Sequence, residues 1–580
     1  MAVMEEEQSD IERKQSLYNS MDEEFKIQKE MYRGQQYSQI YFARLHLMRT
    51  LLYSLVPTWK PHLPVCTVLG LEGDKECVIV GTLYKHMKLK PCVLDEYSKE
   101  RSVTPLVQPH NFVHSDDYLI LEDESGRVKL SGTTLSPSFY VTGIVVALHG
   151  KETGAGDFLV EDVLEAGLPP QLDPPNKLGE DKYVVFVSGL NLGSSSSNPL
   201  QVQLLVDHIT GHLGDEKEQN NAAQIVQVVI AGDSVEIPRE LLNGQNLAPK
   251  DQSRLSEPIK EVDILLTQIA ASIPLDIMPG PNDPSNFAMP QQPLHRCLFP
   301  SSASYNTFKS CTNPHSFELD GVRFLGTSGQ NIHDFEKYSE GSEEVEFLER
   351  TLKWRHIAPT APNTLGCYPF TDRDPFFVES CPHVYFAGNQ NKFGTRLITG
   401  SDGQVVRLIS IPRFSKTGTA VMFLPGSVSV DSRNSKLSEK EAGQVPVLAS
   451  SDELLSKFAQ VGATSNKLAL TLVTNKKNKK LQLSSKRQRS IDRSNPDCES
   501  PTGVSVADRK LLLPPANKRG AATFIRRLGI GKAKLRSRNI NNKSLLGGIE
   551  KTWRKTLKGA SKILIEKHYN QHKRLISDIA

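Results

Sequence analysis

Polar and small residues follow five apolar runs in the middle of the chain, at the point where each run ends. Nitrogen and oxygen donors on neighbouring loops could hold two divalent cations about 3.5–4 Å apart, the arrangement that activates a water against a phosphoester. The strongest donors here are the carboxylates of Asp233 and Asp283. The other positions carry glycine, serine, glutamate or amides: Gly189, Asn191, Glu236, Asn282, Ser328, Asn389 and Asn391. The chemistry open to the site depends on whether this mixture can hold metal ions.

The order and spacing of the five blocks resemble the ligand pattern of the calcineurin-like phosphoesterases: DxH, GDxxD, GNHD or GNHE, an isolated His, and GHxH. The residues differ. Gly189 and Asn191 replace the Asp and His of the first block, and the second keeps Gly232 and Asp233 but ends in Glu236. The third reads Gly280-Pro281-Asn282-Asp283, which shifts the Asn, the fourth has Ser328-Gly329, and the last is Gly388-Asn389-Gln390-Asn391. Since glycine has no donor atom and neutral amides are weak ligands for a dication, we expect no catalytic, cofactor-binding or metal-binding residues here.

The apolar runs themselves predict the elements that position these blocks. Runs at 183–187, 225–231, 275–278, 322–325 and 383–387 are expected to be buried strands, with helices over 200–212 and 259–272. Buried strands that end in polar loops and alternate with helices are typical of an α/β layered sheet with its site at the strand ends. Two further runs, 405–411 and 419–424, are expected to form the last hairpin of this sheet.

A β-rich segment precedes the α/β pattern. Short runs at 77–84, 118–122, 127–131, 138–148 and 158–163 are rich in Val, Ile, Leu and Tyr, with a turn at 124–126 in which Gly126 should take a positive φ. Five such strands suit a small closed barrel of the OB type. Ahead of them, Ile40, Leu47 and Leu51 recur at helical spacing and predict a helix over about 38–55, which Pro57 and Pro61 end. The expected organisation is a flexible acidic arm (1–37), a packing helix (38–58), an OB-fold domain (59–175), an inactive phosphoesterase-like domain (176–426) and a basic, disordered tail (427–580).

Charge is distributed unevenly along the chain. Of the 69 Lys and Arg residues, 32 lie in 431–580, together with only 12 of the 66 Asp and Glu residues, so this segment carries a net charge of +20 and the rest −17. Basic clusters at 476–480 and 486–489 suit nuclear import or contact with phosphate, and 549–576 could form a basic amphipathic helix. The body, in contrast, should repel phosphate.

Other residue types exclude some classes of function. The eight cysteines contain no CxxC pair, which indicates buried thiols in a reducing compartment rather than a zinc site made of these cysteines. No run of about 18 apolar residues predicts a membrane span. Asp233 is expected to cap the turn after its strand. The histidines that could regroup as ligands are expected to be ordinary core or surface residues: His295, His315, His333, His356 and His383.

The particular set of replacements resembles the small (second) subunit of eukaryotic DNA polymerase delta. The segments VSGLNLG, VVIAGDSVE, DIMPGPNDPSN, LHRCLFP, FLGTSGQNI and YFAGNQ carry this resemblance, which covers about residues 35–425. It implies an OB domain followed by an inactive phosphoesterase domain. It also implies a non-catalytic nuclear scaffold, which binds the C-terminal region of the polymerase catalytic subunit and a third subunit, with DNA in the complex and no small-molecule substrate. The family ends shortly after the last hairpin, so the tail is either a genuine lineage extension or a mis-joined gene model.

Two rival functions remain open from the residues alone. The first is an active metallophosphoesterase with unusual ligands, which would depend on Asp233. The second is a single-strand DNA-binding protein, since the barrel offers an aromatic and basic set in Tyr84, Lys85, His86, Lys88, Lys90 and Arg127. Nearby acidic residues at 116–117 and 122–124 oppose the second function, and a protein-binding barrel is favoured.

Overall fold

The computed structural model describes residues 11–28, 34–91, 109–173, 181–236 and 249–425, with side chains omitted for 249–255. These residues all belong to one compact unit, within Met1–Leu481. The predicted basic tail, with its amphipathic helix, therefore lies outside the described residues. Within the described ranges, no helix combines the length and the apolar character that crossing a membrane requires.

The β-rich segment forms a barrel, as predicted. Its strands are β2 (Val65–Cys66), β3 (Glu76–His86), β4 (Tyr118–Glu122), β5 (Arg127–Ser131), β6 (Val145–Glu152) and β7 (Phe158–Leu164), in the order β2-β3-β4-β5-β7-β6. An additional antiparallel pairing of β3 with β6 closes the sheet on itself. The strand predicted over 138–148 begins only at Val145, because Phe139 and Tyr140 both donate backbone hydrogen bonds to Ser136 in a turn.

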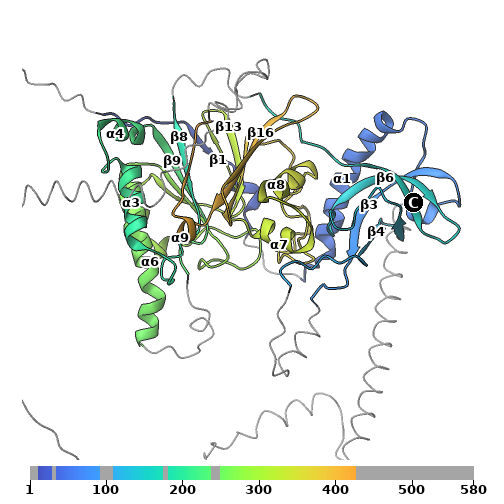
Figure 1. The fold of residues 1–580 in the computed structure, drawn as a ribbon, viewed down its shortest axis with the longest axis horizontal. Helices are drawn as coiled ribbons and strands as arrows, with labels where there is room; N and C mark the ends of the chain where they lie inside the picture. The colour runs from blue at the N-terminus through green and yellow to red at the C-terminus, as the bar shows by residue number, and fades with distance from the viewer. Residues whose placement is uncertain (1–10, 29–33, 92–108, 174–180, 237–248, 426–580) are drawn as a thin grey trace, which may run out of the picture. The chain divides into compact units, whose positions relative to one another are not determined.

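The predicted helix ahead of the barrel is α1 (Ser38–Trp59), which lies against β3 and β6 (Figure 1). Its buried side chains share one face and pack on the outer side of the barrel: Leu45, Met48, Leu52 and Val56 contact the cluster that includes Val78, Val80, Val145 and Ala147. Of the two prolines predicted to end the helix, Pro57 lies in its last turn, and the helix ends at Trp59, two residues before Pro61. The barrel therefore has a helix fixed to it by apolar burial, worth roughly 1.5–3 kcal/mol per buried side chain.

The α/β body has two sheets rather than one. The first has the order β11 (Phe308–Ser310), β10 (Leu275–Met278), β9 (Ile225–Ala231), β8 (Tyr183–Val187) and β17 (Val421–Phe423). The second has the order β1 (Tyr18–Ser20), β12 (His315–Leu319), β13 (Val322–Thr327), β14 (Val384–Gln390), β16 (Val405–Pro412) and β15 (Gly394–Thr399). Apolar side chains from both sheets, including Phe186, Val229, Phe324 and Phe386, form one buried cluster between them.

Helices cover the outer faces of the two sheets. The first sheet is covered by α3 (Pro199–Thr210), α4 (Glu216–Ala223) and α6 (Pro249–Ala270). The second is covered by α7 (Gln330–Tyr338) and α8 (Glu344–Lys353). Figure 1 shows α7 and α8 between the second sheet on one side and α1 and the barrel on the other. Local signals fix the boundaries of α3, since Asn198 caps its first turn and Gly211, in the left-handed region, ends it.

The hairpin predicted from 405–411 and 419–424 is wrong. β16 pairs with β14 and β15 in the second sheet, whereas β17 pairs with β8 in the first. The short helix α9 (Phe414–Thr417) lies between them, and Phe414 and Ser415 donate backbone hydrogen bonds to Ser188 and Gly189. The chain thus crosses from one sheet to the other because the connection is held at the end of β8.

The N-terminal segment also differs from the prediction of a flexible arm, as far as residues 11–28 are concerned. β1 pairs with β12 and is followed by the 3₁₀ helix η1 (Asp22–Phe25), whose Asp22 and Phe25 are buried. Arg13 donates to the carbonyl oxygens of Ala222 and Thr210 at 2.7 and 3.2 Å. A strand of three residues leaves no periodic pattern, so its partner some 300 residues away could not be read from the sequence.

Candidate site at the strand ends

The five loops identified from the sequence meet at one edge of the two sheets. Gly189 donates its backbone N–H to Gly232 O at 2.9 Å, which joins the first block to the second. Asn389 donates from its backbone to Ser188 Oγ at 2.8 Å and from Nδ2 to Ser328 O at 2.9 Å. These contacts join the fifth block to the first and the fourth, so the predicted convergence is found.

Small residues are needed here because the loops touch one another. A Cβ on Gly232 would lie 2.5 Å from Ser328 Cβ, and one on Gly280 would lie 2.4 Å from the backbone nitrogen of Asp233. A Cβ on Gly189 would lie 2.8 Å from Asn389 Oδ1. Real Cβ atoms essentially never come so close to another heavy atom, so these loops approach one another too closely to admit a side chain at the glycines. The first ligand position of the phosphoesterase pattern has therefore no room for an aspartate in this arrangement.

The two surviving carboxylates are engaged as acceptors from the backbone. Asp233 Oδ1 accepts from Asn282 N at 3.0 Å. Asp283 accepts from Val235 N at 3.1 Å and from Gly280 N at 2.8 Å. Asp233 was predicted to cap the turn after its own strand, but its side chain instead accepts from the neighbouring loop that follows β10. Together the pair fastens the second and third loops to each other.

Burial raises the pKa of both carboxyl groups above the ordinary range, and for Asp283 the charge of Asp233 adds to the effect. The charge of Arg413 acts against this rise in the pKa of Asp233. Burial and, as a smaller effect, the charge of Arg413 lower the pKa of His333 to about 4. Arg413 follows β16 and could not be found from the sequence, since it lies outside the five blocks and no spacing rule connects it to them. A fixed guanidinium next to Asp233 disfavours a metal cation at this position.

The amides that replace histidine ligands bond to backbone carbonyls. Asn389 Nδ2 also donates to Ala231 O at 3.3 Å, and Gln390 Nε2 donates to Gly388 O at 2.7 Å. In the described part of the chain, Oδ1 of Asn191, Oδ1 of Asn389 and Oε1 of Gln390 are buried without a hydrogen-bond partner. Neutral oxygens and two carboxylates already bonded to backbone N–H groups do not fit a two-metal centre.

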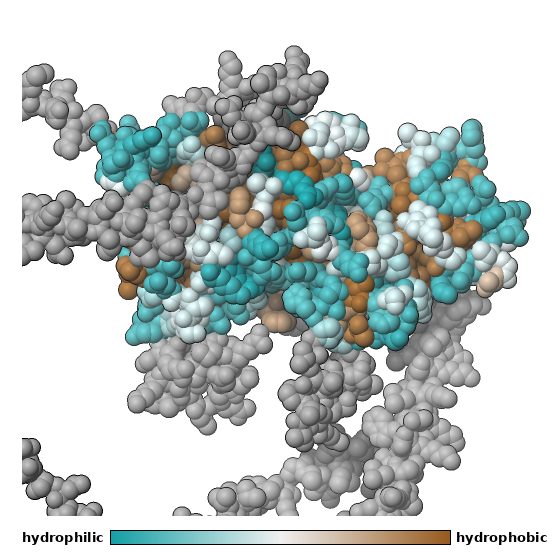
Figure 2. Space-filling view, in the orientation of Figure 1, coloured by the Kyte–Doolittle hydropathy of each residue, from teal (hydrophilic) through white to brown (hydrophobic). Residues whose placement is uncertain are grey.

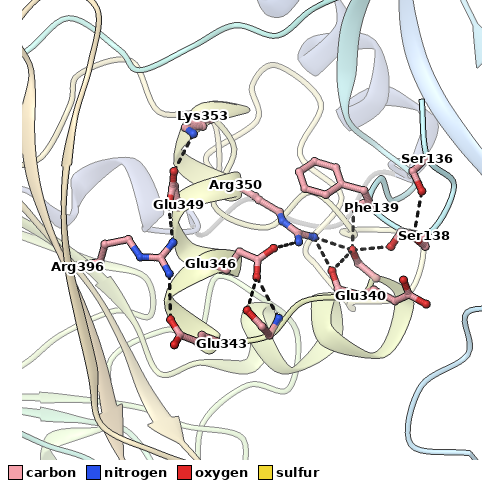
Figure 3. A network of polar contacts seen from close by, with 12 residues as sticks. Ser136, Ser138, Phe139, Glu340, Glu343, Glu346, Glu349, Arg350, Lys353 and Arg396 are labelled. Atoms are coloured by element: carbon pink, nitrogen blue, oxygen red, sulfur yellow. Dashed lines mark hydrogen bonds and ion pairs between the residues drawn. The ribbon is translucent and has the colours of Figure 1, made fainter. Parts of the chain in front are cut away.

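A network of polar contacts joins the barrel to the α/β body, and Figure 3 shows it. Arg350 of α8 donates to Ser339 Oγ at 3.0 Å and to Glu340 O at 2.8 Å, and it pairs with Glu346. Its guanidinium lies 3.8 Å from the centre of the Phe139 ring, which belongs to the barrel. Ser339 Oγ in turn donates to the carbonyls of Ser138 and Phe139. The barrel and the body are thus joined by a polar network as well as by apolar packing.

Arg44 of α1 makes a second connection across the same joint. It is 1% exposed and donates from Nε to Asp374 Oδ2 at 2.7 Å. Its other nitrogens donate to the carbonyl oxygens of Gly143 in the barrel and of Pro359 and Ala361 in the body, at 3.0, 3.1 and 2.7 Å. One buried guanidinium therefore holds α1, the barrel and the body at a single point.

The basic residues that suggested a nucleic-acid groove are engaged with protein groups. Lys85 is buried and donates to Tyr338 O at 2.8 Å. Lys88 pairs with Asp116 at 2.6 Å, and Arg127 pairs with Glu122 at 3.0 Å. Asp116 and Glu122 thus neutralise Lys88 and Arg127, and Lys85 is turned away from solvent. These three cations of the barrel therefore offer phosphate little positive surface.

Comparison with known proteins agrees with this architecture. The family described as the DNA polymerase delta subunit OB-fold domain matches residues 36–163, and the B-subunit family of DNA polymerases alpha and epsilon matches residues 184–395. These two matches, in the order of the barrel and the α/β body, define the chain as a B subunit of the DNA polymerases.

Individual relatives specify the family within this class. The DNA polymerase delta small subunit of Arabidopsis thaliana is 77% identical over 410 residues, which cover 71% of this chain and 93% of the relative. That of Oryza sativa is 68% identical over 412 residues (71% and 96%), and that of Saccharomyces cerevisiae is 35% identical over 391 residues (61% and 78%). The chain belongs to the DNA polymerase delta small-subunit family. The predicted function, an accessory subunit of this polymerase, is confirmed.

Proposed function

We propose that the chain has no catalytic activity of its own and acts as a scaffold in the nucleus. It would bind the C-terminal region of the polymerase catalytic subunit and a third subunit, and hold both near DNA. The observation that carries this proposal is the state of the strand ends. Asp233 and Asp283 accept hydrogen bonds from backbone N–H groups there, and glycine, serine, glutamate or amides occupy the remaining ligand positions. Chemistry would then belong to the partner chain.

The joint between barrel and body supports the scaffold. Two partners held by one chain keep a fixed spacing only if its domains do not move relative to each other. Arg44 and Arg350 connect them, and Trp354 Nε1 donates to Glu165 Oε1 at 2.9 Å across the same joint.

The surface offers apolar side chains for such contacts. On the face drawn in Figure 2, hydrophobic residues are interspersed with hydrophilic ones over both domains. Phe42 on α1 is 49% exposed and Phe287, beyond β10, is 89% exposed. Exposed aromatic residues are the usual anchors of protein interfaces, and a permanent complex would bury roughly 2,000 Å² or more. The basic clusters at 476–480 and 486–489 support nuclear localisation.

Hydrolysis and binding test the two parts of the proposal separately. The purified full chain should not hydrolyse a generic phosphodiester in the presence of Mn²⁺, under conditions in which an active calcineurin-like phosphodiesterase does. Hydrolysis that Asp233→Asn abolishes would instead establish the active enzyme. Metal content alone does not decide this question, since a metal can bind elsewhere in the chain.

Binding is tested by co-expression with the C-terminal region of the polymerase delta catalytic subunit. The proposal predicts stoichiometric co-purification with this region and not with the matched region of the polymerase alpha catalytic subunit. A chain that is folded by circular dichroism but fails to co-purify would refute the scaffold.

A further inference from the structure

A cluster of buried titratable side chains lies away from the strand-end site, where the N-terminal segment crosses the body. It consists of Asp22 in η1, Cys311 directly after β11, His315 at the start of β12 and Asp276 in β10. Ligand atoms of Asp22, Cys311 and His315 all lie within 4.8 Å of one another. In the described part of the chain one other group meets this criterion, and its two glutamates, Glu76 and Glu161, are exposed on the barrel.

The imidazole of His315 is held between two carboxylates. Its Nδ1 lies 2.7 and 2.9 Å from the two oxygens of Asp22, and its Nε2 lies 3.2 Å from Asp276 Oδ2. Proteins present histidine to a metal in this way, with the second ring nitrogen bonded to a carboxylate that fixes the ring. Asp276 is fully buried, and its Oδ1 has no hydrogen-bond partner among the described residues. Phe317 stacks on the imidazole at 4.9 Å between ring centroids and limits its rotation.

The donor atoms of the cluster suit a dication. Asp22 offers a carboxylate oxygen, His315 an imidazole nitrogen and Cys311 a thiol sulfur. A Zn²⁺ ion would displace the proton of the thiol, since a coordinated thiol is deprotonated.

We propose that Asp22, Cys311 and His315 form a zinc site, with Asp276 as the residue that positions His315. Thiolate and imidazole ligands favour zinc over magnesium or calcium. Ligand atoms of a tetrahedral zinc with bonds of about 2.0–2.3 Å lie roughly 3.3–3.8 Å apart. Asp22 Oδ1 and His315 Nδ1 are 2.7 Å apart without the ion, so they would separate by about 0.6 Å or more to admit it. Cys311 Sγ lies within 4.8 Å of the other two ligand atoms and would approach them by about 1 Å at most. A cavity of about 450 Å³ lies beside the cluster, and Asp22 and Cys311 are among the residues that line it. We expect a water that is the fourth ligand to reach the ion from this side.

The site would fasten the N-terminal segment to the body. Asp22 and His315 are 293 positions apart in the sequence. Asp276 lies in β10 of the other sheet, and Cys311 follows its edge strand β11. The same place is already joined by hydrogen bonds of 2.8 Å from Ser316 N to Asp22 Oδ1 and from Met21 N to Ser316 O. A zinc ion would add a bond between the segment and both sheets. This inference does not depend on the proposed scaffold.

Cobalt titration of the full chain, treated with a chelator beforehand, tests the site. Co²⁺ should give a thiolate-to-metal charge-transfer band that one equivalent of Zn²⁺ removes. Cys311→Ser should lose the band, whereas the exposed Cys297→Ser and the barrel variant His149→Gln should keep it. Asp276→Asn should retain the band with an affinity roughly 10–100-fold weaker, as expected for a residue that orients a ligand. Absence of the band in the folded wild-type chain, or an equal band in Cys311→Ser, would overturn the proposal.

Hydrogen exchange gives a second, independent readout. Zinc should slow amide exchange over Tyr18–Phe25 in the wild-type chain and in Cys297→Ser, and should have no effect in Cys311→Ser. Equal exchange with and without zinc in the wild-type chain would contradict the fastening role.

Discussion

Replacement of Arg44 by methionine tests whether the joint between barrel and body depends on one buried guanidinium. The change removes four hydrogen bonds and leaves Asp374 buried without its cation, bonded to His356 Nε2 at 2.8 Å and to Phe376 N at 3.1 Å. Removing one partner of a buried ion pair typically costs about 3–5 kcal/mol. We expect a loss of this size in the free energy of unfolding, measured by urea denaturation at pH 7.

Arg49→Met is the matched control on the same helix. Arg49 pairs with Glu124 at 3.0 Å near the surface, and such pairs contribute about 0–1 kcal/mol. A cycle with Asp374→Asn should show a coupling of about 2–3 kcal/mol between Arg44 and Asp374. If Arg44→Met costs no more than Arg49→Met, the guanidinium does not hold the joint.

The pH dependence of the same pair of proteins gives an internal check. Although burial opposes it, Arg44 and His356 hold the pKa of Asp374 well below its usual value. A depressed folded-state pKa contributes stability that is present above the unfolded pKa, about 3.8, and is lost as the pH falls through the folded pKa. The advantage of the wild-type chain over Arg44→Met should therefore shrink below about pH 4.

Three further outcomes are expected. Gly143→Ala should cost at least about 2 kcal/mol more in thermal or urea unfolding than Gly156→Ala, since both have positive φ but a Cβ at Gly143 alone would lie 2.1 Å from Pro359 O; equal costs would refute the close approach. Asp283→Asn should gain stability relative to wild type as the pH rises from 4 to 8, because a raised folded-state pKa contributes stability below the unfolded pKa that is lost as pH rises through the folded one; a constant difference would contradict the shift. Binding of single-stranded DNA should be steep in salt for the full chain and largely absent without residues 426–580, which contain the segment with a net charge of +20; equal binding by the shortened chain would instead assign it to the barrel.

Much of the fold could be predicted because apolar runs and turn residues act locally. The ranges expected for β4, β5, β9 and β10 agree with the observed strands, and the order of strands was enough to bring the five loops together. The predictions were wrong where pairing with a segment distant in the sequence determines the structure. β17 joins the first sheet because it pairs with β8, and the turn before β5 is held by Asp123 Oδ1, which accepts from Ser125 N and Gly126 N, so that Gly126 needs no positive φ.

The candidate site shows the same division. The replacements at Gly189, Asn191 and Asn389 are visible in the sequence because the spacing of their blocks is regular. Arg413 and the contacts between Asp22 and His315 are not, since these residues come together only through the crossing of the sheets. Spacing rules detect ligands that share an element, and they miss those gathered by tertiary structure.

A scaffold of this kind has to connect the catalytic subunit to the third subunit. A tagged C-terminal region of the polymerase delta catalytic subunit, mixed with the third subunit, tests it directly by pulldown with and without the full chain. If the chain is a scaffold, the third subunit is retained only when the chain is present, and the three proteins are recovered in equal amounts. Retention of the third subunit to the same extent without the chain would contradict it.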